Sequence, residues 1–471
     1  MVEGWVHGEC LETALGRIPK SALSYELSPA GVPNELLIMH RFGGAAMKAI
    51  RALAICASLL LVEAAESWSQ VLAIRAGRII DGVSPRPEEN VVIVVEKGRI
   101  ADVGPGIGVP AGAPVIDLRN FTVLPGLIDC HTHVCLTPDY SRNNPVLNKS
   151  VAYRALEGAA AARATLEAGF TTLRDLDSEG ADFADVAVRD AIARGLLPGS
   201  RLLVATLALS ITGGHMNQTG LAPEIDERVP QLAVMTDSTD EMIREVRRQV
   251  KYGADWIKLY ATGTMRHIDP KTLEPLPQVS EEQVRAVVEE ARRWRKDVAA
   301  HAYGGDGARA AVLGGVRSIE HGMLLERDIL ELMASRGTFW CPTLSVFQPQ
   351  NEEEAADPLL ARILERQKQV FRDAMAAGVK IAFGTDAGGV SHGSNARELK
   401  LMVSMGMEPM RAIQSATSVA AELLRMEGEI GRIQKGYAAD LIAVAGDPLK
   451  NVELLQNVSF VMKGGVVVKQ P

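Results

Sequence analysis

Two closely spaced histidines are the first sign of chemistry in this sequence. His131 and His133 follow the apolar run of LPGLIDCHTH, which has the composition of a buried β-strand. Side chains alternate along a strand, so both imidazoles point to the same side, about 6–7 Å apart along the chain. Two such imidazoles can bind one metal ion, although this pair alone is a weak signal.

Further groups with metal-binding chemistry stand at the ends of other predicted strands. They are Lys258 in DWIKLY, His301 in VAAH, His321 in RSIEH and Asp386 in KIAFGTD. Imidazoles and a carboxylate without thiolates are typical of a catalytic site for zinc or a similar divalent ion. The alternative is a set of unrelated core histidines with a capping aspartate. The combination at strand ends favours a metal site.

Lys258 lies in an apolar strand, where an ammonium group is costly to bury. It could be exposed on a sheet edge, or it could extend outward between helices. In a third interpretation, burial lowers the pKa of the amine, which reacts with carbon dioxide to give an anionic carbamate. The donor count favours this third interpretation. One ion would then be held by His131, His133 and Asp386, the other by His301 and His321, and carboxylated Lys258 would bridge them.

The elements that must position these groups alternate between strands and helices from residue 121 to residue 426. Strand-like runs such as TTLRDL and VAAH are separated by helical runs, many of which end at glycine, the usual C-cap. About eight such units predict an α/β fold, a (β/α)8 TIM barrel, with functional groups at the C-terminal ends of its strands. The alternative, an open doubly wound sheet, lacks the glycine-rich nucleotide motif after its first strand.

Strand and turn patterns also occur on both sides of this region. VLAIRAGRIIDG and NVVIVVEKGRI precede it, and DLIAVAGDP and FVMKGGVVVK follow it. Neither block is long enough to form a good core alone. We therefore expect residues 67–120 and 427–471 to combine in one small β-sandwich beside the barrel.

The N-terminal segment has a different character. Residues 1–46 carry no convincing periodicity and are predicted to be a disordered or non-native extension. Residues 47–66 begin with two positive charges and an apolar run, followed by small residues, which is the pattern of a secretory signal peptide. A periplasmic or secreted protein is therefore expected; the alternative is a cytoplasmic protein whose leader has no function.

Composition narrows the class of partner. The 471 residues are 47% hydrophobic and carry a net charge of -8, so we expect a globular protein without a nucleic-acid partner. No apolar run reaches the ~20 residues of a membrane span. The five scattered cysteines fit neither a disulfide framework nor a thiolate zinc site. Barrels of this kind often assemble, so a homo-oligomer is expected.

Other residues are candidates for contact with a substrate. Tyr260 projects to the same side as Lys258, so its phenol could donate to a developing oxyanion; otherwise it is a pocket wall. His215 follows two glycines in a loop and could bind a substrate carboxylate or the oxyanion. His392, beyond the eighth strand, is a further candidate contact; for both histidines the alternative is a surface loop. Arg266 could pair with a substrate carboxylate, but a solvated loop charge is the favoured interpretation.

The sequence resembles the amidohydrolase superfamily over roughly residues 70–470, through PGLIDCHTH, the Lys258 strand, VAAH, SIEH and FGTDAG. IKLYATG, the GGH that ends at His215 and GTDAGGVSHGSN resemble its imidazolonepropionase-like branch, with prolidase-type dipeptidases and ochratoxin-hydrolysing amidases. The resemblance implies two divalent ions, with zinc expected, bridged by carboxylated Lys258. It also implies that Asp386 moves the proton. Imidazolonepropionases themselves resemble a one-metal variant, which is partly at odds with a lysine bridge.

These observations predict a binuclear metal-dependent amidohydrolase that cleaves an amide bond of a dipeptide or N-acyl amino acid. A hydroxide shared by the two ions would attack the carbonyl. The alternative is a hydrolase of cyclic amides or amidines of the imidazolonepropionase type. A non-enzymatic scaffold on the same fold is a third possibility, but such proteins usually lack ligands, and none is missing here.

Overall fold

The computed structural model describes residues 71–140, 143–217, 220–226 and 228–471. The predicted extension, residues 1–46, and the predicted signal peptide, residues 47–66, lie outside these ranges. Within them, every helix is too short or too polar to span a bilayer.

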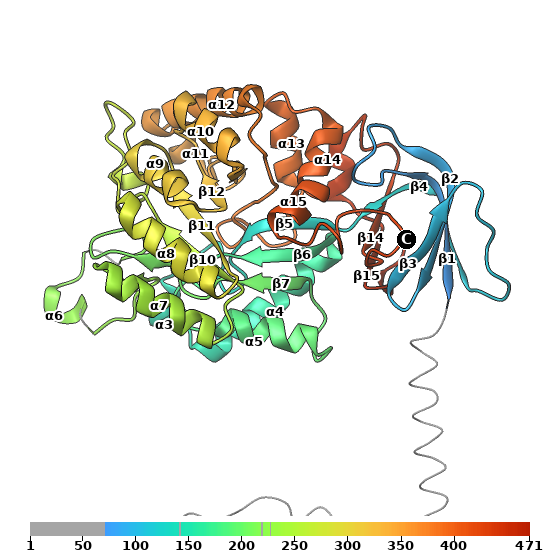
Figure 1. Cartoon of the computed structure of the whole chain (residues 1–471), viewed down its shortest axis with the longest axis horizontal. Helices are drawn as coiled ribbons and strands as arrows, with labels where there is room; N and C mark the ends of the chain where they lie inside the picture. The colour runs from blue at the N-terminus through green and yellow to red at the C-terminus, as the bar shows by residue number, and fades with distance from the viewer. Residues whose placement is uncertain (1–70, 141–142, 218–219, 227) are drawn as a thin grey trace, which may run out of the picture. The chain divides into compact units, whose positions relative to one another are not determined.

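A mixed sheet, with both antiparallel and parallel pairs, contains strands from the two ends of the described chain (Figure 1). Its seven strands run in the order β16-β15-β14-β4-β1-β2-β3. They are β1 (Leu72–Ile79), β2 (Glu88–Glu96), β3 (Arg99–Gly104), β4 (Val115–Pro125), β14 (Leu441–Ala445), β15 (Phe460–Lys463) and β16 (Val466–Lys469). The central pairing of β4 with β14 is antiparallel, with Pro125 opposite Leu441.

This sheet bends back on its own core instead of forming two separately bonded sheets. At its β3 edge, Ile100 N donates to Tyr437 O at 2.9 Å, close before β14. Apolar residues such as Ile74, Ile93 and Phe460 alternate inward and form one cluster. The expected pairing of the two chain ends is therefore present.

The strands between these ends are parallel and belong to two open sheets. The smaller sheet has the order β5-β6-β7 and the larger the order β13-β12-β11-β10-β8-β9. The strands are β5 (Leu127–Thr132), β6 (Phe170–Asp175), β7 (Arg201–Val204), β8 (Leu209–Ser210), β9 (Val234–Met235), β10 (Trp256–Tyr260), β11 (Asp297–Ala302), β12 (Ser318–His321) and β13 (Phe339–Cys341). The mixed α/β class is thus confirmed, but closure into one continuous barrel sheet is not seen.

Backbone hydrogen bonds outside the sheet ladders cross both gaps between these sheets. Asp255 N, just before β10, donates to Val204 O of β7 at 2.7 Å. The predicted eighth strand, residues 380–386, forms isolated bridges in place of a strand. Its Ala382 N donates to Trp340 O of β13, and its Phe383 O accepts from Cys130 N of β5, both at 2.9 Å.

Helices cover the outside of the parallel strands, and α8 and α9 contact β11 (Figure 1). Serine capping boxes begin α7 and α8, while glycines in the left-handed conformation end α9, α10 and α12, as the sequence predicts. The helices are α3 (Pro145–Asn148), α4 (Val151–Glu167), α5 (Ala184–Ala193), α6 (Pro223–Asp226), α7 (Thr239–Lys251), α8 (Glu281–Arg293), α9 (Gly305–Gly314), α10 (Arg327–Arg336), α11 (Glu352–Ala355), α12 (Pro358–Ala377), α13 (Arg397–Ser404), α14 (Pro409–Ser415) and α15 (Ser418–Leu423).

Gly126 connects the end sheet to the first parallel strand and fixes their close approach. β4 ends at Pro125 and β5 begins at Leu127, so a single residue lies between them. A Cβ atom at Gly126 would collide with the side chain of Thr171, and its N–H donates to Asp440 O at 2.8 Å. The absence of a side chain here lets β5 leave the sheet and carry its histidines directly into the parallel region.

Candidate metal centre

One cavity of about 680 Å³ collects most of the residues that the sequence singles out. It opens at the C-terminal ends of β5, β10, β11 and β12, where inward side chains from different strands meet. The predicted residues that line it are His131, His133, His215, Lys258, Tyr260, Arg266, His301, His321 and Asp386. His392 is not among the described residues that line it.

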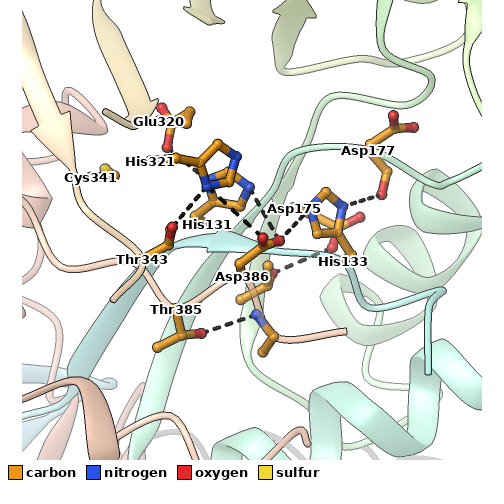
Figure 2. A network of polar contacts seen from close by, with 12 residues as sticks. His131, His133, Asp175, Asp177, Glu320, His321, Cys341, Thr343, Thr385 and Asp386 are labelled. Carbon is orange, nitrogen blue, oxygen red and sulfur yellow. Dashed lines mark hydrogen bonds and ion pairs between the residues drawn. The ribbon is translucent and has the colours of Figure 1, made fainter. Parts of the chain in front are cut away.

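Three of these side chains bring their ligand atoms together. Asp386 Oδ1 lies 2.9 Å from His133 Nε2 and 3.5 Å from His131 Nε2. Figure 2 shows the Asp386 carboxylate between the rings of these two histidines. Among the described residues, this is the one group of three or more histidines, cysteines or acids whose ligand atoms all lie within 4.8 Å.

The other two histidines stand beside this group. The ring of His321 is centred 4.9 Å from that of His131 and 4.6 Å from that of His301. His321 and Asp386 both have left-handed backbone angles, φ 70° and 62°, which are uncommon for residues other than glycine. Such conformations cost free energy and are often found where function requires a fixed direction of a side chain.

Outer partners orient three of the histidines through their Nδ1 atoms (Figure 2). His131 Nδ1 lies 2.8 Å from Glu320 Oε2, His133 Nδ1 lies 3.0 Å from Asp177 O, and His321 Nδ1 lies 2.8 Å from Thr343 Oγ1. A ring held in this way by one nitrogen presents the other as a ligand. The imidazoles are therefore arranged as metal-binding histidines usually are.

Unpartnered nitrogen atoms also fit a metal ion. His131 Nε2 and His301 Nδ1 are buried and make no hydrogen bond within the described part of the chain. Buried polar atoms normally have a partner, so these two require one of another kind. Neutral imidazole nitrogens beside a carboxylate are a suitable donor set for a divalent cation.

Lys258 lies inside the cavity wall rather than on an edge or between helices. Lys258 belongs to β10, its side chain lines the cavity, and the residue is only 1% exposed. Burial lowers the pKa of its amine, although Glu320 and Asp386 oppose this effect. The exposed-edge and outward interpretations of this lysine are therefore wrong, and an amine with reduced basicity faces the histidines.

The charges of the centre are strongly coupled. Burial disfavours the charged form of Asp386, but the neighbouring His131 and His133 outweigh it and hold the pKa of this carboxyl well below its usual range. Burial lowers the pKa of His131, reinforced by Lys258. Burial would lower the pKa of His133, but its hydrogen bond with Asp386 raises this pKa to about 10, so a divalent ion that binds here would displace a proton from His133.

Known proteins share this chain's sequence and fold over most of its length. The amidohydrolase family profile matches residues 122–468. The chain belongs to the amidohydrolase family. An ochratoxinase from Aspergillus niger is 31% identical over 442 residues, which cover 87% of this chain and 89% of the relative. The solved structure of a Xaa-Pro dipeptidase with bound methionine in the active site is 35% identical to this chain, with a TM-score of 0.78. The match covers 85% of this chain and 100% of the dipeptidase chain.

An imidazolonepropionase from Paracoccus denitrificans is 27% identical over 382 residues, which cover 75% of this chain and 87% of the relative. These relatives confirm the predicted branch of the family. As an amidohydrolase, the chain is a hydrolase that acts on C–N bonds of amides.

The candidate substrate contacts of this amidohydrolase differ in their positions. Tyr260 donates its hydroxyl proton to Asp177 Oδ2 at 2.8 Å. His215 packs between Tyr260 and His301, with ring centres 4.2 Å and 4.1 Å away, and its Nδ1 has no partner in the described chain. Arg266 is exposed at the cavity rim. His392 Nε2 lies 3.2 Å from Leu136 O, behind the cavity wall.

Several functional groups were not predicted from the sequence. Glu320, directly before His321, lies 2.8 Å from His131 Nδ1 and accepts a hydrogen bond from Arg174 Nη2 at 2.9 Å. Asp177 holds both Tyr260 and the ring of His133. No local pattern pairs Glu320 with His131, because the two residues lie 189 positions apart in the chain.

Proposed function

We propose that this amidohydrolase uses two divalent metal ions to cleave the amide bond of a dipeptide or an N-acyl amino acid. The observation that carries the proposal is the convergence of His131, His133, Asp386 and buried Lys258 in one cavity. A single ion would need only the first three of these side chains. The buried lysine facing two further histidines is best explained by a second ion.

As the scaffold of this site we propose a closed (β/α)8 barrel over residues 121–426, flanked by a composite sheet domain of residues 67–120 and 427–471. The hydrogen bonds across both gaps support closure, because Asp255 bonds to β7 and residues 382–383 bond to both β13 and β5. Short strands joined by isolated bridges are consistent with a barrel that is distorted where its functional residues lie.

The proposed ligands divide into two sets. His131, His133 and Asp386 would hold one ion and His301 and His321 the other, with a carboxylated Lys258 between them. We expect zinc because the donors are imidazoles and carboxylates. When bound, such ions polarise a carbonyl oxygen and lower the pKa of water toward neutrality.

The side chains of the chain would handle the proton and the developing charge. We propose that Asp386 accepts the proton of the attacking water and delivers it to the leaving amine nitrogen. Its ionised state and its position among the histidines suit a proton acceptor. His215 and Tyr260 line the same cavity and would donate to the carbonyl oxygen as it becomes negative. Tyr260 would then exchange its bond to Asp177 for one to the substrate.

The substrate class is inferred from the relatives and from the size of the cavity. One relative is an ochratoxinase, and another is a Xaa-Pro dipeptidase solved with methionine in its active site. A cavity of about 680 Å³ accommodates a molecule of dipeptide size. Arg266 at its rim is placed to pair with a terminal carboxylate.

A substrate panel tests this function. Zinc-loaded full-length protein would be assayed against dipeptides, N-acyl amino acids and cyclic amides, including imidazolonepropionate. We expect hydrolysis of linear amides that end in a free amino acid carboxylate. Turnover of cyclic amides alone would contradict the proposal and favour the imidazolonepropionase type of activity.

A further inference from the structure

Glu179 is a buried acid in the cavity wall that the metal centre does not explain. The residue is 1% exposed, lies in the loop after β6 and lines the cavity. Its Oε1 lies 3.5 Å from His133 Nδ1, but this nitrogen already has a closer partner in Asp177 O at 3.0 Å. Its Oε2 has no hydrogen-bond partner within the described residues.

The backbone holds this carboxylate in place at some cost. Glu179 has φ 54°, in the left-handed region that glutamate rarely adopts. Its N–H donates to Asp177 Oδ1 at 2.9 Å, and its carbonyl accepts from Arg154 Nη1 at 2.7 Å. A strained residue that several bonds fix in one position is a frequent feature of a binding site.

The guanidinium of Arg154 donates its hydrogen bonds to backbone carbonyl oxygens and not to this carboxylate. Arg154 is buried, and its remaining hydrogen bonds go to the carbonyl oxygens of Cys135 and Ser178. A buried carboxylate oxygen without a hydrogen-bond partner is unfavourable, and the penalty on Glu179 Oε2 is relieved when a cation with hydrogen-bond donors arrives. The cavity therefore contains an acceptor for a cationic group of the ligand.

We propose that Glu179 binds the free α-ammonium group of a dipeptide substrate, so that the enzyme prefers dipeptides to N-acyl amino acids. This inference rests on the proposed function, because it assigns one end of the substrate in the same site. His133 has Glu179 on its Nδ1 side and Asp386 on its Nε2 side. In a dipeptide the ammonium nitrogen is two bonds from the scissile carbonyl carbon. The same molecule can therefore place its ammonium group at Glu179 and its scissile bond beside Asp386. An N-acyl amino acid has no cation at this position.

A binding experiment tests the assignment without hydrolysis. Zinc-loaded full-length protein would be titrated by calorimetry with the ketomethylene analogues of alanyl-methionine and of propanoyl-methionine, which lack a cleavable bond. We expect the analogue with the ammonium group to bind about 10- to 100-fold more tightly, the usual effect of one charged hydrogen bond. Glu179→Gln should abolish this difference, and Glu179→Asp should retain part of it.

A matched control lies in the same loop. Asp182 is exposed and also has a positive φ of 49°, so Asp182→Asn removes a charge near Glu179 without touching the cavity lining. We expect this variant to keep the full preference for the ammonium analogue. Equal affinity of the two analogues for the wild-type protein, failure of both to bind, or an unchanged preference in Glu179→Gln would overturn the inference.

Hydrolysis of alanyl-methionine and propanoyl-methionine separates the inference from the proposed function. We expect Glu179→Gln to lower kcat/KM for the dipeptide about 10- to 100-fold and to leave that for the acyl compound nearly unchanged. An equal loss for both compounds would mean that Glu179 only positions His133, which overturns the inference. If neither compound nor any other linear amide is hydrolysed but the Glu179-dependent binding preference holds, the proposed function fails, and Glu179 is an ammonium-binding residue of a site with another substrate.

Discussion

The two halves of the proposed metal centre are held together in different ways. On the β5 side, His131, His133 and Asp386 already contact one another, with ligand atoms 2.9 and 3.5 Å apart. On the β10–β12 side, His301 and His321 meet only through their rings, 4.6 Å between centres. The Nζ atom of Lys258, which is buried in the same wall, lies 5.6 Å from the centre of the Tyr260 ring.

This difference indicates what each half requires. In the β5 half an anionic carboxylate lies between two imidazoles, and its contact with His133 Nε2 and the backbone hydrogen bond from Asp386 N to His131 O bring these ligands together. The other half contains imidazoles and an amine, and its acid, Glu320 of β12, is already bonded to His131 and Arg174. It lacks an anionic ligand unless the lysine becomes one, which is the physical argument for a carbamate at this position.

Substitution of Asp386 breaks the β5 half and should have the largest effect. Asp386→Asn removes both the anionic ligand and the proposed proton acceptor, so we expect kcat to fall by about 10³-fold. Steady-state kinetics with zinc-saturated protein would measure this loss, with Asp182→Asn as the control for removal of a charge. Activity within tenfold of wild type would rule out the proton-transfer role.

Substitution of Tyr260 tests the β10 side with less damage. Tyr260→Phe keeps the packing against His215 but removes the hydroxyl, so we expect kcat to fall by about 10²-fold if the phenol stabilises the oxyanion. A change confined to KM would instead make Tyr260 a wall of the pocket. Retention of zinc by the variant would exclude loss of metal as the cause.

Substitution of Thr343 should weaken only the second half. Thr343→Ala removes the partner of His321 Nδ1, and loss of such an outer hydrogen bond typically lowers metal affinity by about 10- to 100-fold. Thr343→Ser keeps the hydroxyl and should behave as wild type. Competition with a chelator would measure the affinities; equal weakening of both ions would show that the two halves do not act separately.

The sequence was sufficient to select the proposed metal ligands because their signals are local. Strand alternation places His131 and His133 on one side, and strand ends carry His301 and His321, so short motifs were enough. Glu320 and Asp177 act through partners far along the chain, which periodicity cannot pair. The left-handed backbone of Glu179 follows from bonds to Arg154 and Asp177, and no local pattern predicts it.

For the fold, too, the sequence predicts the types of the elements better than their tertiary bonding. The alternation of apolar runs and capped helices correctly predicted parallel strands covered by helices, and the end blocks correctly predicted a shared sheet. The run KIAFGTD reads as a full strand, but its residues divide their hydrogen bonds between β13 and β5 and form bridges only. Strand length depends on such tertiary bonding, so composition alone overestimates it here.

The metal content of the wild-type protein and of Lys258→Ala tests the central claim most directly. Both proteins would be loaded with zinc, freed of excess metal and measured for zinc per chain and for hydrolysis of the same substrate. The two-ion account predicts two ions in the wild type, no more than one in Lys258→Ala, and loss of most activity. One ion per chain in both proteins, with activity unchanged by the substitution, would contradict a bridging role for Lys258.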